Sequence, residues 1–182
     1  MNVLVIGSGG REHAIIEAIS RSPKAEKIYA APGNAGIAQL AECVAIKDTE
    51  VDKLLDFAQS NAIDLTVVGP EASLAVGVVD RFREAGLKIF GPTKAATEIE
   101  SSKDFAKRLM KKYDVPTADY ATFTNYEEAL AYVKRGPLPT VLKYGGLAAG
   151  KGVVIATTME EAEATLRDML LDTKVGDGRV VI

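Results

Sequence analysis

The feature that most constrains the fold is an alternation, over the first hundred residues, of short apolar runs with longer helical patterns. Each run lasts about four residues and ends at a glycine or a proline, as buried parallel strands do. The runs are Val3–Ile6, Ile28–Ala31, Leu65–Val68 and Leu87–Phe90. Strands that alternate with helices of this length indicate βαβ units, and therefore an α/β fold with a doubly wound parallel sheet.

The stretches between these runs are predicted helices, because each gathers apolar residues on one face. The helices and their expected buried faces are Arg11–Ser22 (Ala14, Ile15, Ala18, Ile19), Val51–Ser60 (Val51, Leu54, Leu55, Ala58) and Leu74–Ala85 (Val78, Val79, Phe82).

The pattern changes after the fourth run, which predicts a domain boundary between Gly91 and Pro116. We take residues 1–100 as one domain and residues 101–182 as the first part of a second. The elements expected beyond Gly91 are one or two helices in Thr93–Lys112 with caps at Thr93 and at Ser101 or Ser102, helices at Tyr126–Lys134 and Glu160–Leu171, and strands at Ala118–Thr122, Thr140–Tyr144, Val153–Ala156 and Arg179–Ile182.

Composition restricts the classes of partner. The net charge of −3 argues against a non-specific nucleic-acid binder, although a local basic pocket remains compatible with it. The single cysteine, Cys43, allows no internal disulfide, fits a cytosolic setting, and is expected to be a small buried hydrophobe. The apolar run at the N-terminus is too short for a signal peptide, and no run approaches the roughly 20 residues of a membrane span.

The predicted strands of the first domain are each followed by a loop of special residues, reading GSGGR, PGNAG, GPE and GPT. In open α/β sheets, ligands bind beyond the carboxyl ends of the strands. The four loops are therefore expected to converge on one rim and to form a binding site there.

The first of these loops, Gly7–His13, predicts phosphate binding, with Arg11 as a charged donor and the helix N-terminus as a source of N–H groups. A dinucleotide fingerprint reads G-x-G-x-x-G, but Glu12 stands in place of the third glycine, and the second strand lacks a terminal acidic residue. NAD binding is therefore disfavoured. The alternative is a plain tight turn, and His13 is interpreted as structural.

Two further loops carry polar side chains that suit a sugar or an amine. Asn34 can donate and accept hydrogen bonds, whereas an ionised Glu71 can only accept them. Each loop alone is also a common turn. Their shared position after strands is what favours a binding role.

The glycine-rich segment Lys143–Gly152 nearly spells a Walker A loop, but Gly152 replaces the Ser or Thr that would hold magnesium. It leads into an apolar strand instead of a helix, so we expect a hairpin that folds over nucleotide phosphates, or alternatively a mobile solvent hairpin. Lys143 lies in an otherwise apolar strand and needs an anionic partner if buried. Lys103 stands near a helix start, against the preference of the helix dipole, which is compatible with a phosphate-binding lysine.

The motifs, taken in order, resemble the glycinamide ribonucleotide synthetase (phosphoribosylamine–glycine ligase) family of the ATP-grasp superfamily. The resemblance rests on GSGGREHA at Gly7–Ala14, PGNAG at Pro32–Gly36, VGPE at Val68–Glu71, FGPT at Phe90–Thr93, SK at Ser102–Lys103 and GLAAGKGV at Gly146–Val153. It implies a Rossmann-like pre-ATP-grasp domain followed by the beginning of an ATP-grasp domain.

The resemblance also implies a reaction, in which ATP phosphorylates the carboxylate of glycine and the amine of phosphoribosylamine attacks the acyl phosphate. It implies ATP and Mg²⁺ (or Mn²⁺), small-molecule partners without nucleic acid or membrane, a cytoplasmic monomer, and no covalent nucleophile. The residues it places on phosphoribosylamine are Gly9, Gly10, Arg11, Glu12, Asn34, Ala35, Gly36, Gly69, Pro70 and Glu71. Those it places on ATP are Lys103, Lys143, Gly145, Gly146, Leu147, Ala148, Ala149, Gly150, Lys151 and Gly152.

This sequence departs from the family pattern at three points. The family pattern KADGLAAGKG begins here as Lys143-Tyr144-Gly145-Gly146, so an acidic group is missing. The family pattern EGSK is here Glu100-Ser101-Ser102-Lys103. The sequence ends at Ile182, before the family's adenine-binding hinge and magnesium ligands, so we expect no metal ligand in this chain and no activity from it alone. The alternatives are a non-catalytic phosphosugar- or nucleotide-binding module from a truncated paralogue, and an ATP-grasp ligase that acts on another carboxylate.

Overall fold

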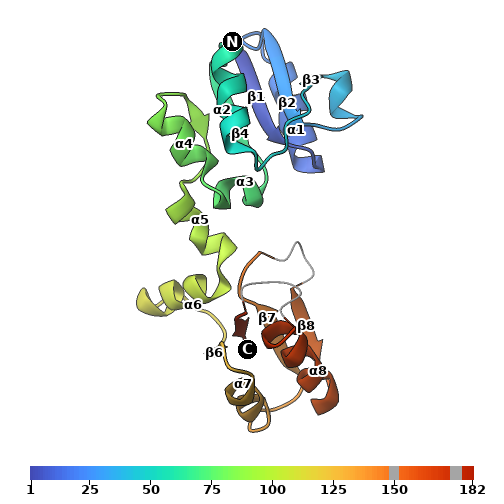
Figure 1. Ribbon diagram of the computed structural model, residues 1–182, viewed down its shortest axis with the longest axis vertical. Coiled ribbons are helices and arrows are strands. Elements are labelled where there is room, and N and C mark those ends of the chain that lie inside the picture. Colours follow the sequence, from blue (N-terminus) through green and yellow to red (C-terminus); the bar gives the residue numbers. More distant parts are fainter. Residues whose placement is uncertain (148–151, 173–177) are drawn as a thin grey trace. The chain divides into compact units, whose positions relative to one another are not determined.

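The computed structural model describes residues 1–147, 152–172 and 178–182. The chain divides into two compact units, Met1–Thr97 and Glu98–Ile182, and each is described by itself (Figure 1).

The first unit contains a five-stranded parallel sheet in the order β3-β2-β1-β4-β5. This confirms the predicted doubly wound α/β fold. The strands are β1 (Asn2–Gly7), β2 (Lys27–Pro32), β3 (Glu42–Cys43), β4 (Leu65–Val68) and β5 (Ile89–Phe90), and the helices are α1 (Gly10–Ser20), the 3₁₀ turn η1 (Ile37–Gln39), α2 (Val51–Ser60), α3 (Glu71–Ala75) and α4 (Val78–Glu84).

The central strand β1 separates two apolar layers, because successive side chains of a strand point to opposite faces. Leu4 and Ile6 belong to the core that contains α2 and α4, whereas Val3 and Val5 pack with Ile16 of α1. Figure 1 shows α2 crossing the face of this sheet. Both faces of β1 are therefore buried, which explains why its sequence is a continuous apolar run instead of an alternating one.

The predicted helix Leu74–Ala85 is wrong as a single element. Gly77 adopts a left-handed conformation (φ = +90°), and this breaks the segment into α3 and α4. A left-handed residue cannot continue a right-handed helix, and glycine takes that conformation at little cost. The fourth apolar run pairs only at Ile89–Phe90, and the short edge strand β3 was not predicted.

The predicted face of α1 is only partly right. Ile15 and Ile19 pack against the core that contains Val3 and Val5, as expected. Ala14 and Ala18 are exposed, and the fully buried residues of the helix are Glu12 and Ile16. Cys43 is exposed on the edge strand β3, so its predicted burial is wrong as well.

The second unit holds an antiparallel sheet in the order β6-β9-β7-β8. The strands are β6 (Thr122–Phe123), β7 (Thr140–Tyr144), β8 (Val153–Ala156) and β9 (Val180–Val181), and the helices are α6 (Lys103–Lys112), α7 (Tyr126–Val133) and α8 (Met159–Leu170), with α5 (Lys94–Ser101) leading into them from the first unit. The segment expected as one or two helices is therefore two, and the predicted strand Ala118–Thr122 is reduced to Thr122–Phe123.

One face of this sheet carries the core of the unit. Leu142 and Tyr144 of β7 pack with α7 and α8. The opposite face leaves Val153 and Ile155 exposed, at 51% and 62%. Lys143 is half-buried on that second face, because its neighbours in the strand point the other way.

No helix in the described ranges is both long enough and apolar enough to cross a bilayer.

Two phenylalanines in the first unit provide a matched stability test. Phe82 is fully buried in the core between α4 and the sheet, whereas Phe90 is 71% exposed. We expect Phe82→Ala to lower the free energy of unfolding by about 3–5 kcal/mol. Phe90→Ala should change it by less than about 1 kcal/mol, since surface substitutions usually have small effects. Urea unfolding followed by circular dichroism measures both, and equal losses would contradict the assigned core.

Candidate functional site

Three of the loops that follow strands in the first unit meet around the carboxyl end of β1. Gly33, after β2, donates its N–H to the carbonyl of Gly7 at 3.1 Å. Gly69, after β4, donates its N–H to the carbonyl of Ile6 at 3.1 Å. The expected convergence is confirmed for these loops. They also mark the point where the strand order reverses, which is the position at which open α/β sheets bind ligands.

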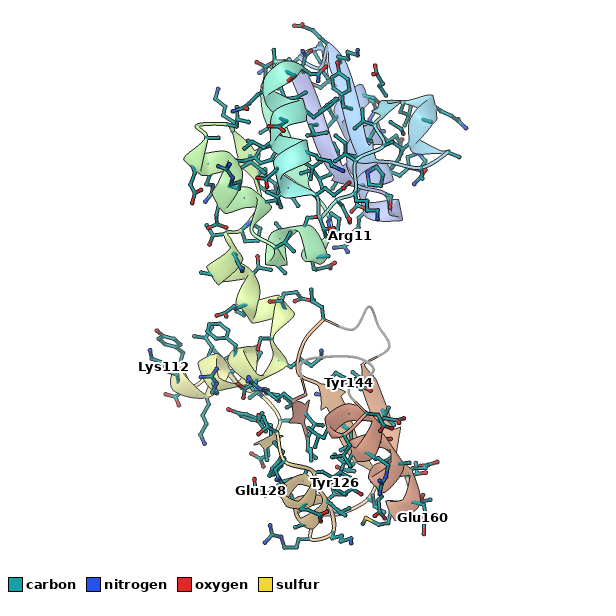
Figure 2. All side chains as sticks on the ribbon, in the orientation of Figure 1. Arg11, Lys112, Tyr126, Glu128, Tyr144 and Glu160 are labelled. Atoms are coloured by element: carbon teal, nitrogen blue, oxygen red, sulfur yellow. The ribbon has the colours of Figure 1, made fainter. Side chains whose placement is uncertain are left out.

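An ion pair joins two of these loops. The guanidinium of Arg11 donates to Oε1 of Glu71 at 2.9 Å, from the start of α1 to the start of α3. Figure 2 shows Arg11 at this end of the unit, beside α3. The Glu71 backbone N–H and, second, the Arg11 guanidinium hold the pKa of the Glu71 carboxyl below its usual value of 4.5. Both side chains are solvent-accessible, so a ligand can reach them.

Asn34 bridges the other pair of loops. Its Nδ2 donates to the carbonyl of Ser8 at 2.8 Å, and its Oδ1 accepts the N–H groups of Gly36 and Ile37 at 2.8 and 2.9 Å. The polar capacity expected to face a ligand is thus used largely within the protein, and Asn34 holds the PGNAG loop against the first loop. The ring of His13 packs against Gly36, which agrees with the structural role expected of it.

Glu12 lies among the same loops but faces inward. Its side chain is buried, and its Oε2 accepts the N–H of Gly9 at 2.6 Å. The structure therefore brings Glu12 to the site without presenting its carboxylate to solvent. Gly9, Gly10 and Ala35 are exposed at the rim, and Gly36, Gly69 and Pro70 are half-buried there.

In the second unit, the start of α6 is fixed against the loop that follows β7. Lys103 donates its backbone N–H to the carbonyl of Gly145 at 2.8 Å, and its Nζ to the carbonyl of Gly146 at 2.9 Å. Ser102 is the N-cap, because its Oγ accepts the N–H of Phe105 at 3.2 Å. The sequence motif SK is thus in contact with the first residues of the glycine-rich segment.

Asp104 is a buried acidic residue that sequence reasoning missed. Its carboxylate accepts hydrogen bonds from Thr122 at 2.9 Å, Arg108 at 3.0 Å and Arg179 at 3.1 Å. It thereby ties α6 to β6 and to the residue before β9. The available signal was an aspartate next to Lys103 in the first turn of a serine-capped helix, but its distant partners could not be read from sequence.

Tyr144 and Gly145, where the sequence departs from the expected family pattern, both make structural contacts in this chain. Tyr144 is 8% exposed and fills the core beside α8, and burial, with the Asp168 carboxylate second, raises the pKa of its phenol. Gly145 donates its N–H to the carbonyl of Arg179 at 2.9 Å. The side chain of the same Arg179 donates to the carboxylate of Asp104 at 3.1 Å.

A pocket of about 650 Å³ lies in the second unit, within the usual size range of small-molecule sites. Its wall includes Lys143 and Val141 of β7 together with Lys107, Tyr120 and Ile182. The predicted ATP-facing residues Ala148, Ala149, Gly150 and Lys151 lie outside the described residues, whereas Leu147 is exposed and Gly152 is buried and accepts the N–H of Tyr144 at 2.8 Å.

Within residues 1–147, 152–172 and 178–182, no group of three or more His, Cys, Asp or Glu side chains could hold a metal ion.

Known families and relatives fit this geometry. The family profile described as "Phosphoribosylglycinamide synthetase, N domain" matches residues 1–100, and that described as "Phosphoribosylglycinamide synthetase, ATP-grasp (A) domain" matches residues 101–182. The chain belongs to the phosphoribosylglycinamide synthetase family. Phosphoribosylamine–glycine ligases of Pasteurella multocida and Escherichia coli K12 are 55% and 54% identical to all of it. The chain spans 43% of the length of each of these relatives.

Solved structures support the same fold. The phosphoribosylamine–glycine ligase of Thermotoga maritima covers 100% of this chain with a TM-score of 0.80 and 32% identity, and the chain covers 43% of it. A second structure is the biotin carboxylase domain of Hydrogenobacter thermophilus 2-oxoglutarate carboxylase in complex with MgADP, with a TM-score of 0.77. The match covers 99% of this chain and 43% of that domain. At 19% identity, the second likeness concerns the fold alone.

Asp104 should be important for the stability of the second unit. We expect Asp104→Asn to lower the free energy of unfolding by about 1–2 kcal/mol. Hydrogen bonds to charged groups contribute about 1.5–3 kcal/mol, and the solvent exposure of Arg108 and Arg179 reduces this. Hydrogen exchange at the Lys103 and Gly145 amides should also accelerate. Asp172→Asn, at an exposed position, is the control. Equal effects of the two substitutions would show that the hydrogen bonds of Asp104 do not stabilise the second unit.

The Arg11–Glu71 pair predicts a specific acid dependence. Because the pKa of Glu71 is lowered in the folded state, its contribution to stability is complete above about pH 4.5 and is lost as the pH falls through the lower folded-state pKa. Glu71→Gln should remove this part of the pH dependence, so the two proteins should converge in stability towards pH 3. Urea unfolding between about pH 3 and 6 measures this, with Glu84→Gln as the control. A constant difference over that range would argue against the pair.

Proposed function

We propose that this chain is part of an ATP-dependent ligase that joins glycine to 5-phosphoribosylamine, giving glycinamide ribonucleotide, ADP and phosphate in purine biosynthesis. The observation that carries the proposal is the accessible Arg11–Glu71 pair, 2.9 Å long, at the switch point of a chain in the phosphoribosylglycinamide synthetase family. The names of the relatives do not favour the alternative of a non-catalytic module.

The first unit is proposed to bind phosphoribosylamine. Arg11 supplies a planar guanidinium that suits a phosphate, together with the N–H groups of the first turn of α1. Glu71 stays ionised at neutral pH and can accept hydrogen bonds from the substrate amine or a hydroxyl group. Gly9, Gly10, Ala35, Gly36, Gly69 and Pro70 form the rim, and Asn34 holds two of its loops together.

The second unit is proposed to bind ATP phosphates through Lys103 and Lys143, with the segment Gly145–Gly152 as a cover. Its contacts support this role, because Lys103 is already joined to the carbonyls of Gly145 and Gly146, and Lys143 lines the pocket. Residues 1–100 would then be the pre-ATP-grasp domain and residues 101–182 the first part of the ATP-grasp domain.

The chemistry needs charge stabilisation more than a protein nucleophile. Transfer of the γ-phosphoryl group to the glycine carboxylate makes an acyl phosphate, because a carboxylate alone is a poor electrophile. The substrate amine then attacks the acyl carbon, a C–N bond forms, the C–O bond to phosphate breaks, and the amine loses a proton. The lysines stabilise the transferred charge, and the binding loops orient the reactants. Magnesium, when bound, would supply further charge neutralisation on the phosphates. We propose a cytoplasmic monomer that acts on these small molecules.

The phosphosugar half of the proposal can be tested on this chain. We expect it to bind ribose 5-phosphate, and Arg11→Ala to weaken binding about 10–100-fold, the equivalent of about 1.5–3 kcal/mol for a charge-assisted contact. Arg21→Ala, at the other end of α1, is the matched control, since Arg21 pairs with Glu17 away from the loops. Isothermal titration calorimetry gives both affinities, and equal losses would count against Arg11 as the phosphate donor.

The catalytic half needs a chain extended to the length of its relatives. Such a chain should form glycinamide ribonucleotide from ATP, glycine and phosphoribosylamine, and Lys143→Ala should abolish most of that turnover because the transferred charge loses a cation. Lys112→Ala, exposed at the end of α6, is the control. The 182 residues alone should show no ligation. Failure of the extended chain would contradict the proposed activity, whereas turnover by the 182 residues would contradict only their expected inactivity.

A further inference from the structure

Glu12 is the residue that sets this loop apart from a dinucleotide-binding loop. It occupies the third-glycine position of Gly7-x-Gly9-x-x-Glu12, and the residue is only 4% exposed. In dinucleotide-binding folds, the second glycine lets the backbone approach a pyrophosphate, and the third allows close packing of helix on strand. A buried carboxylate at this place therefore changes what the loop can accept.

The glycines around Glu12 leave room for that carboxylate and for little else. A Cβ atom at Gly7 would lie 2.6 Å from Glu12 Cγ, and one at Gly9 would lie 2.9 Å from Oε2. A Cβ at Gly69 would overlap Glu12 Oε1. The space that glycines create between the loops after β1 and β4 is therefore filled by the Glu12 side chain.

One oxygen of this carboxylate has a structural role. Its Oε2 accepts the N–H of the N-cap residue Gly9 at 2.6 Å, as the N3 glutamate of a capping box does. Its Oε1 is buried and has no hydrogen-bond partner among the residues that the structure describes. An unpaired buried acceptor is destabilising, and such groups persist mainly where function requires them.

The donors that remain suit one phosphate group. The first N–H groups of a helix have no intrahelical acceptor, so those of Gly10 and Arg11 stay available at the start of α1, beside the Arg11 guanidinium. A second phosphate along the loop would need the Gly9 N–H and the space at Gly69, and it would approach a negative charge.

We propose that Glu12 is a specificity residue that limits this loop to a phosphate monoester and excludes a diphosphate substituted at both ends. The inference rests on the proposed function, because it assigns the loop to the substrate phosphate. In this inference, the carboxylate prevents nucleotide diphosphates from binding to a type of fold that binds them in other proteins.

The test compares ribose 5-phosphate with ADP-ribose, whose diphosphate carries a group at each end and must lie along the loop. Binding is followed by NMR at the amides of Gly9, Gly10 and Arg11. The variants are Glu12→Ala, which empties the space, Glu12→Gly, which restores the fingerprint, and Glu12→Gln, which keeps the volume without the charge. Glu17→Ala, on the exposed part of α1, is the control for net charge.

The wild-type chain should bind ribose 5-phosphate at the loop and ADP-ribose at least about tenfold more weakly. In Glu12→Ala and Glu12→Gly, the affinity for ADP-ribose relative to ribose 5-phosphate should rise at least about tenfold, with a smaller rise in Glu12→Gln. Glu17→Ala should leave this ratio unchanged. Circular dichroism identifies which variants are folded. If glycine at position 12 destabilises α1, the Glu12→Ala variant still provides the test, because alanine has a high helix propensity.

The outcomes separate the two proposals. If no folded Glu12 variant raises the ratio, or if the wild-type chain already binds ADP-ribose at the loop as tightly as ribose 5-phosphate, the inference about Glu12 is overturned. If the wild-type chain binds no ribose 5-phosphate while the variants gain ADP-ribose, the proposed substrate fails, and of the inference only the exclusion of the diphosphate by Glu12 stands.

Discussion

Parallel pairing of β1 with β2 on one side and with β4 on the other determines where chemistry can occur in the first unit. The chain builds outward from β1 to β3 and then returns to start β4, so the loops after β1 and β4 are neighbours without a helix crossing between them. Arg11 and Glu71 stand at the start of those two connections. The cation, the carboxylate and the free helix N-terminus therefore face one place because of the strand order.

The second unit depends on a different kind of constraint. The start of α6 is joined to the loop after β7 by the hydrogen bond from the Lys103 N–H to the Gly145 carbonyl, and to Arg179 by the buried Asp104 carboxylate. Asp104 anchors Arg179 from α6, and Arg179 in turn accepts the Gly145 N–H, so the lysine next to Asp104 keeps a defined position.

The sequence predicted the parallel sheet well because each central strand is buried on both faces and so is apolar throughout, as Val3–Ile6 shows. The convergence of the loops followed from the same topology. The break at Gly77 was missed because a single glycine costs a helix only about 1 kcal/mol and is no firm stop signal. The bridging by Asn34 and the partners of Asp104 depend on residues far away in the chain, which no local pattern encodes. The burial of Glu12 depends in part on Gly69, which is equally distant.

A crystal structure of this chain grown with ribose 5-phosphate would test the central claim most directly. The account predicts the phosphate within hydrogen-bonding distance of the Arg11 guanidinium and of the N–H groups of Gly10 and Arg11, with Glu12 still buried beneath it. A phosphate bound in the pocket beside Lys143, with the loops after β1 and β4 unoccupied, would contradict it.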